Sequence, residues 1–140
     1  MNASYFNLSL FKEDGVLLRF HSLANVGRRP SEEDWEELLR LFEQEQPAFR
    51  DFLMSHQHSL NDTELKTCML ARIHINPRAI GNMLGVSGAY ISKIRGKMVR
   101  KVFNDGGGLK RFDRLIADIG SLPLAPSKRG VDGFSLMDGP

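Results

Sequence analysis

The spacing of apolar residues between Pro77 and Met98 constrains the fold of this chain more than any other feature of the sequence. One apolar set recurs at helical spacing before Gly85 and another follows it, and glycine tolerates the positive φ of a tight turn. The expected inward-facing residues are Ile80 and Leu84, followed by Ile91, Ile94 and Met98. The segment therefore predicts two short helices that cross at a steep angle, a helix-turn-helix, with Gly81 where the backbones come closest.

Capping residues predict where the preceding helices begin. Ser31 is followed three positions later by Asp34, and Asn61 by Glu64. Each pair has the spacing of a capping box, in which two backbone N–H groups are satisfied reciprocally. Pro47 suits the first position of another helix, since proline lacks an N–H group that would be unsatisfied there in any case.

These patterns divide the chain into five segments. They are an N-terminal arm and helix (1–30), an acidic helical pair containing Trp and Phe (31–58), the helix-turn-helix unit (59–104), a C-terminal helix after a flexible glycine-rich break (105–120) and a tail expected to be disordered (121–140). We expect an all-α fold, a multi-helix domain in which a trihelical helix-turn-helix core is preceded by two to three supporting helices.

The charge of the chain is strongly divided, although its net charge is only +2. Ten acidic residues lie between Ser31 and Glu64, whereas none lies between Leu65 and Val102. The second stretch, the basic block, contains Lys66, Arg72, Arg78, Lys93, Arg95, Lys97, Arg100 and Lys101. Because the basic block coincides with the helix-turn-helix, it favours phosphate binding over a merely solvated helix face.

The outward positions of the second helix also favour contact with DNA. They are Gly88, Ala89, Tyr90, Ser92, Lys93, Gly96 and Lys97, all of them small, polar or basic. A helix exposed only to water would more often mix Glu with Lys at these positions. In a helix-turn-helix the second helix lies in the major groove, so the pattern predicts binding of double-stranded DNA.

The stretch from Leu60 to Phe103 resembles the C-terminal effector domain of LuxR-type and response-regulator transcription factors, and is also similar to region four of sigma factors. With the preceding EEDWEELLRLFEQEQPAFRDFL, it most resembles the C-terminal regulatory domain of Bacteroidetes tetratricopeptide-linked transcriptional regulators. Gly81 departs from the alanine usual in such domains, and a mid-helix glycine costs about 0.5–1 kcal/mol.

The resemblance implies a sequence-specific DNA-binding transcriptional regulator with a major-groove recognition helix. Matched by position, the residues directed toward base edges are Ala89, Tyr90, Lys93 and Lys97. Those nearer the phosphates are Ser87, Arg95, Arg100 and Lys101.

A homodimer that binds paired half-sites is expected, because one recognition helix provides little contact area. The apolar residues expected at the dimer surface are Phe6, Phe11 and Phe20 and the helix 109–119. The alternative is a protein-interaction module without direct base readout. It would dock on RNA polymerase or a partner regulator through the acidic face from Glu32 to Glu45.

The composition and the sequence pattern also argue against several other classes of protein. Cys68 is the only cysteine, which excludes an internal disulfide and a multi-cysteine zinc site. The histidines are scattered and no nucleophile–base constellation appears, so we expect neither an enzyme, a cofactor nor a metal. No apolar run approaches the roughly 20 residues that span a bilayer, and the N-terminus lacks a secretion-signal pattern. A cytoplasmic location without membrane contact is expected.

Overall fold

The computed structural model describes residues 15–121, and these residues form seven α-helices and one short 3-10 helix. In chain order they are α2 (Gly15–Val26), α3 (Glu32–Glu45), α4 (Pro47–Ser55), α5 (Asp62–Arg72), α6 (Pro77–Leu84), α7 (Gly88–Lys101), η2 (Leu109–Arg111) and α8 (Phe112–Asp118). No strand occurs within this range, so the predicted all-α class is confirmed. The predicted N-terminal arm over 1–14 and the tail after Ser121 lie outside the described residues.

Both predicted capping boxes form. The Ser31 Oγ accepts from the Asp34 backbone N–H at 3.1 Å, and the Asp34 carboxylate accepts from the Ser31 N–H at 2.8 Å. Asn61 and Glu64 exchange the same two bonds at 2.8 and 2.9 Å. The starts of α3 and α5 are therefore specified locally by the sequence.

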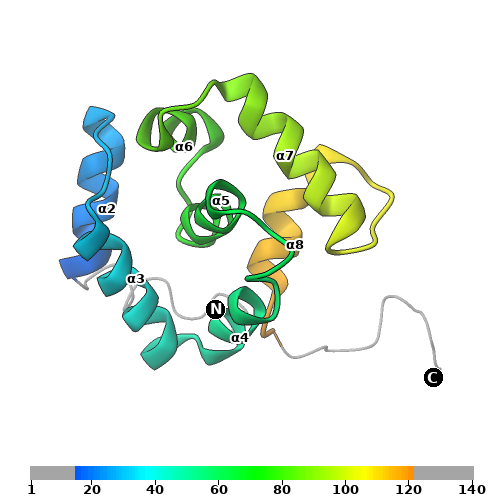
Figure 1. Ribbon diagram of the computed structural model, residues 1–140, viewed down its shortest axis with the longest axis horizontal. Helices are drawn as coiled ribbons and strands as arrows, with labels where there is room; N and C mark the ends of the chain where they lie inside the picture. Colours follow the sequence, from blue (N-terminus) through cyan, green and yellow to red (C-terminus); the bar gives the residue numbers. More distant parts are fainter. Residues whose placement is uncertain (1–14, 122–140) are drawn as a thin grey trace.

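The acidic helix α3 and the basic helix α7 lie at opposite edges of the molecule. In Figure 1, α3 and α4 form the lower edge, α6 and α7 form the upper edge, and α5 lies between them. Helix α2 packs against α3 and α6, while α8 packs against α5 and α7. The central α5 consequently supports both α6 and α7 from behind.

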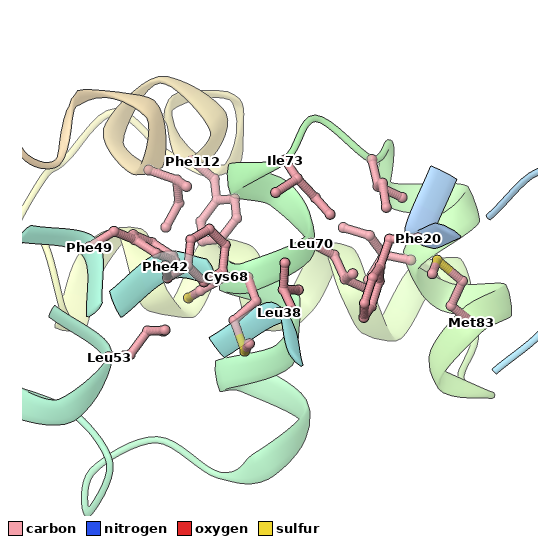
Figure 2. Close-up of a cluster of buried hydrophobic side chains, with 14 of the residues drawn as sticks. Phe20, Leu38, Phe42, Phe49, Leu53, Cys68, Leu70, Ile73, Met83 and Phe112 are labelled. Atoms are coloured by element: carbon pink, nitrogen blue, oxygen red, sulfur yellow. The ribbon is translucent and has the colours of Figure 1, made fainter. Parts of the chain in front are cut away.

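One apolar core joins all seven α-helices. Figure 2 shows part of this core, with side chains from α2 to α6 and α8 labelled. Aromatic rings meet edge to face in two places, Phe20 with Trp35 at 5.2 Å and Phe42 with Phe49 at 4.8 Å between ring centroids. Cys68 is fully buried in this core, and burial raises the pKa of its thiol to about 12. Cys68 is thus a small core residue.

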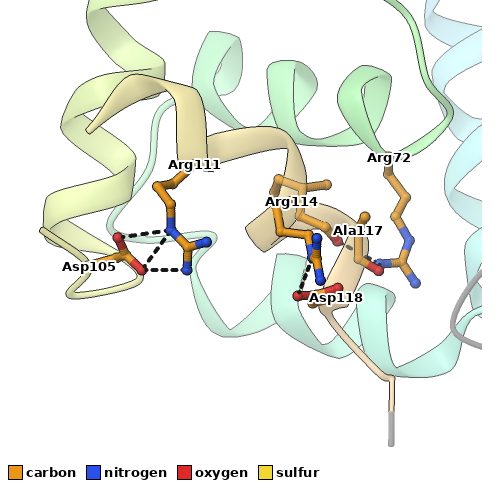
Figure 3. A network of polar contacts seen from close by, with 7 residues as sticks. Arg72, Asp105, Arg111, Arg114, Ala117 and Asp118 are labelled. Atoms are coloured by element: carbon orange, nitrogen blue, oxygen red, sulfur yellow. Dashed lines mark hydrogen bonds and ion pairs between the residues drawn. The ribbon is translucent and has the colours of Figure 1, made fainter. Parts of the chain in front are cut away.

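Arg72 is a cation buried within the same core. Its Nε and Nη2 donate to the Gln46 Oε1 at 2.9 and 2.6 Å, and its Nη1 donates to the Ile116 carbonyl at 2.7 Å. Figure 3 shows Arg72 beside the C-terminal end of α8, where Nη1 also reaches the Ala117 carbonyl. Burial lowers the pKa of Arg72 to about 10. These oxygens, including the negative end of a helix dipole, compensate for the lost hydration.

The C-terminal segment differs from the single helix predicted over 109–119. A 3-10 turn covers Leu109–Arg111, and α8 runs only from Phe112 to Asp118. The segment predicted as a flexible break is tied down by Asp105, which accepts from the Gly107 N–H at 2.8 Å and pairs with Arg111 at 3.0 Å (Figure 3). The hydrogen bond from Arg111 lowers the pKa of Asp105. Periodicity alone could not reveal this side-chain clamp.

The predicted dimer surfaces are largely internal. Phe20 is fully buried against Trp35, and Phe112 and Ile116 are fully buried beneath α5 and α7. Phe6 and Phe11 lie outside the described residues. The prediction is therefore wrong for Phe20 and for the buried face of the 109–119 segment, because intramolecular packing occupies these side chains.

Replacing Arg72 should destabilise the fold far more than replacing an exposed arginine nearby. Arg72→Met removes the donors to Gln46, Ile116 and Ala117, so we expect a loss of about 2–4 kcal/mol in the free energy of unfolding. Arg114→Met is the matched control, since the Arg114 side chain is 72% exposed and, among residues 15–121, forms an ion pair only with Asp118. It should cost less than about 0.5 kcal/mol in urea unfolding. Equal losses in the two variants would contradict a structural role for Arg72.

Asp34→Asn should reduce stability at neutral pH and converge with the wild type in acid. The hydrogen bond from Arg19 Nε, 2.6 Å long, is the main cause that lowers the pKa of Asp34. Because the folded pKa is lower than the unfolded one, the stabilisation is complete above an ordinary pKa of about 4. It is lost as the pH falls through the lowered folded pKa. Denaturant unfolding from neutral pH to about pH 2 tests this, and a gap independent of pH would exclude the ionised carboxylate as the cause.

Candidate nucleic-acid interface

The three helices α5, α6 and α7 pack against one another. Side-chain caps fix the residues at which α6 and α7 begin. The Asn76 Oδ1 accepts from the Ala79 N–H at 2.8 Å, and Pro77 follows as the first residue of α6. The Ser87 Oγ accepts from the Tyr90 N–H at 3.0 Å and caps α7. Both helices therefore begin at a residue whose side chain caps the first turn.

The turn between α6 and α7 depends on two glycines. Gly85 ends α6 with φ +74°, a conformation that glycine adopts without strain. The Gly81 carbonyl accepts from the N–H groups of both Gly85 and Val86, the second at 2.9 Å. A Cβ at Gly81 would lie 2.9 Å from the Val86 carbonyl oxygen, too close for ordinary contact. The departure from alanine at this position thus has a steric reason.

The predicted inward-facing residues pack as expected. Ile80, Ile91, Ile94 and Met98 are buried, and Leu84 is partly buried against the core. Met83 is also buried, although sequence analysis did not single it out. Its position three residues after Ile80 was the signal that could have identified it.

An exposed stripe runs along α7. It consists of Ala89, Tyr90, Lys93, Lys97, Arg100 and Lys101, all exposed and separated by steps of three or four residues or adjacent to one another. Tyr90 is 38% exposed at the N-terminal end of this stripe. All four residues expected at base edges therefore lie on one accessible surface.

Four cations of the basic block are engaged within the molecule. Lys66 pairs with Asp62 at 2.9 Å and lies 4.9 Å from the Trp35 ring centroid, while Arg72 is buried as described above. Arg95 is only 7% exposed and pairs with Asp113 at 3.3 Å. Its predicted phosphate contact is therefore incompatible with its position, because the guanidinium faces α8.

Lys97 is the fourth engaged cation, and it remains half exposed. Its Nζ lies 3.3 Å from the Glu64 Oε2, whose side chain is almost completely buried. Glu64 thus caps α5 through one oxygen and pairs with α7 through the other. Of the candidate base contacts, Lys97 is the one whose charge already has a partner.

The remaining cations of the basic block are Arg78, Lys93, Arg100 and Lys101, all exposed. Within residues 15–121 none of them forms an ion pair. Two further exposed cations, Arg28 and Arg29, lie in the α2–α3 loop. Arg29 lies against Gly85, in the turn before α7. Sequence analysis did not single out these two residues, although two adjacent arginines were a signal that could have identified them.

In comparisons of the chain with known proteins, no family model, curated sequence or solved structure matches it. The resemblance to LuxR-type effector domains therefore stays a prediction from the sequence. Within the described range, no helix combines the length and the apolarity needed to cross a bilayer.

Alanine substitutions at two mid-helix glycines should change stability in opposite directions. Gly81→Ala places a methyl group against the Val86 carbonyl and should destabilise the fold. Gly96→Ala meets nothing closer than the Leu109 Cβ at 4.0 Å, so it should stabilise by about 0.5–1 kcal/mol. Thermal unfolding of both variants measures the contrast. If Gly81→Ala were also stabilising, the close approach of α6 to the turn would be refuted.

Proposed function

We propose that the protein is a sequence-specific DNA-binding transcriptional regulator whose recognition helix, α7, enters the major groove. The observation that carries the proposal is the exposed stripe of α7, which combines small, aromatic and basic side chains without a carboxylate. The positive charges of this surface are attracted to the phosphates that line the major groove. A helix face that packs against another protein segment does not require such a basic surface.

The proposed contacts fall into two groups. Ala89, Tyr90 and Lys93 occupy the N-terminal half of α7 and would meet base edges, where lysine donates to guanine and alanine packs against the thymine methyl group. Lys97 would join them only by exchanging Glu64 for a base. The phosphate contacts are assigned to Ser87, Arg78, Arg100 and Lys101.

A homodimer is part of this proposal. Two recognition helices about 34 Å apart would meet successive turns of the major groove on one face of the duplex. Because Phe20, Phe112 and Ile116 are buried, the dimer contacts must come from other residues. The order of a capped α5 followed by α6 and α7 also supports the LuxR-like relationship, and a regulator of this class would act in the cytoplasm.

A protein-interaction module is the second candidate, supported by the exposed carboxylates of α3. Glu36, Glu43 and Glu45 are exposed. They belong to α3, which lies on the edge opposite α7 (Figure 1). This surface could dock on RNA polymerase or a partner regulator. It predicts protein binding that survives the loss of Lys93 and no salt-dependent affinity for any duplex.

Lys93→Ala should weaken binding to a selected duplex by about 1–3 kcal/mol and relax the preference at one base position. The duplex is obtained by selecting bound sequences from a random pool with the wild-type protein. Arg114→Ala is the control, because it removes an exposed cation from α8 rather than α7. Affinity is measured by fluorescence anisotropy.

Several outcomes would contradict the assignment of α7. Selection that recovers no preferred sequence, or a Lys93→Ala variant with wild-type affinity and preference, would exclude α7 as the recognition helix. Salt-independent association with duplexes would count against DNA binding altogether, since phosphate contacts release counterions.

A further inference from the structure

The α2–α3 loop follows a defined course toward the α6–α7 turn. Gly27 ends α2 with φ +69°, and its N–H donates to the Ala24 carbonyl at 3.3 Å. The Arg28 N–H donates to the Leu23 carbonyl at 3.0 Å, which completes a Schellman motif. The backbone that carries Arg28 and Arg29 is thus fixed by the end of the helix.

Arg29 lies directly on the turn that precedes the recognition helix. Its guanidinium fills the space that a Cβ at Gly85 would occupy, with Cζ 2.7 Å and Nε 3.0 Å from that position. Gly27 lies within ordinary contact distance of α6, since a Cβ there would be 3.9 Å from the Asn82 Cβ. The absence of a side chain at Gly85 is therefore what admits Arg29.

Both loop arginines are exposed, and neither forms an ion pair with a described residue. The carboxylates closest in sequence are Glu32 and Glu33, in the first turn of α3. There they face the positive end of the α3 dipole, which attracts carboxylates. Neither charge is therefore neutralised by a carboxylate of residues 15–121.

We propose that Arg28 and Arg29 form a second DNA-binding element, in which each arginine holds a backbone phosphate beside the groove entered by α7. This inference rests on the proposed DNA-binding function. If the N-terminal half of α7 meets base edges, the turn before it faces the wall of the groove, which consists of phosphates. An arginine fork suits a phosphate because two N–H groups can donate to it in parallel.

The test is the salt dependence of binding to a fluorescent mixed-sequence duplex about two helical turns long, measured between about 50 and 200 mM salt. Arg28→Ala and Arg29→Ala should each lower the slope of log affinity against log salt by about 1. Arg29→Lys should retain the slope because it retains the charge. Arg40→Ala, which removes an exposed cation from α3 on the opposite edge, is the matched control and should leave the slope unchanged.

Sequence preference separates this element from the recognition helix. Selection from a random pool should return the same sequence for Arg28→Ala and Arg29→Ala as for the wild type, whereas Lys93→Ala should alter it. Thermal unfolding confirms that each variant is folded. If Arg29→Ala does not fold, the salt slope of Arg28→Ala and of Arg29→Lys is measured instead.

The outcomes distinguish the failure of this inference from that of the proposed function. Wild-type slopes in Arg28→Ala and in every folded Arg29 variant, with Lys93→Ala still impaired, would overturn the loop assignment and leave the recognition helix standing. A wild-type protein without salt-dependent affinity for the duplex would overturn both. An equal loss of slope in Arg40→Ala would show a general charge effect and would also overturn the assignment.

Discussion

The arrangement of this domain depends on one buried cation. Arg72 donates to three neutral oxygens that belong to distant parts of the chain, one on Gln46 and two at the end of α8. Gln46 itself ends α3 and precedes α4, so the guanidinium fixes the junction of two helices and the terminus of a third. Because Arg72 is the last residue of α5, it also holds the helix that supports α6 and α7.

Features encoded by neighbouring residues could be predicted from the sequence, whereas those that depend on distant partners could not. The capping boxes at Ser31 and Asn61 involve residues three apart, and both form as predicted. Which cations of the basic block would be buried and which would stay exposed could not be predicted from the sequence. Arg72 and Arg95 are removed from the surface by groups on other helices, and a run of like charges says nothing of which members will be buried.

In the candidate interface, too, local features could be predicted from the sequence and features that depend on packing between helices could not. Helical periodicity identified the exposed positions Ala89, Tyr90 and Lys93, because a face of one helix follows from its own spacing. Arg29 was missed because its place beside Gly85 results from the packing of α2 on α6. The residues near Arg29 in the sequence, Gly27 and Pro30, indicate the end of a helix but not a contact with Gly85. Long-range packing thus enlarges the basic surface beyond the segment that carries the motif.

The double hydrogen bond at Gly81 has a mechanical consequence for α6 and α7. Its carbonyl accepts from the first two N–H groups of the turn, while the Val86 carbonyl oxygen lies 2.9 Å from the position that a Cβ at residue 81 would occupy. Because these contacts restrain the turn, we expect α6 and α7 to move together. Any displacement of α7 would then also displace α6, and the contact of α6 with α2 is a surface across which the pair could shift.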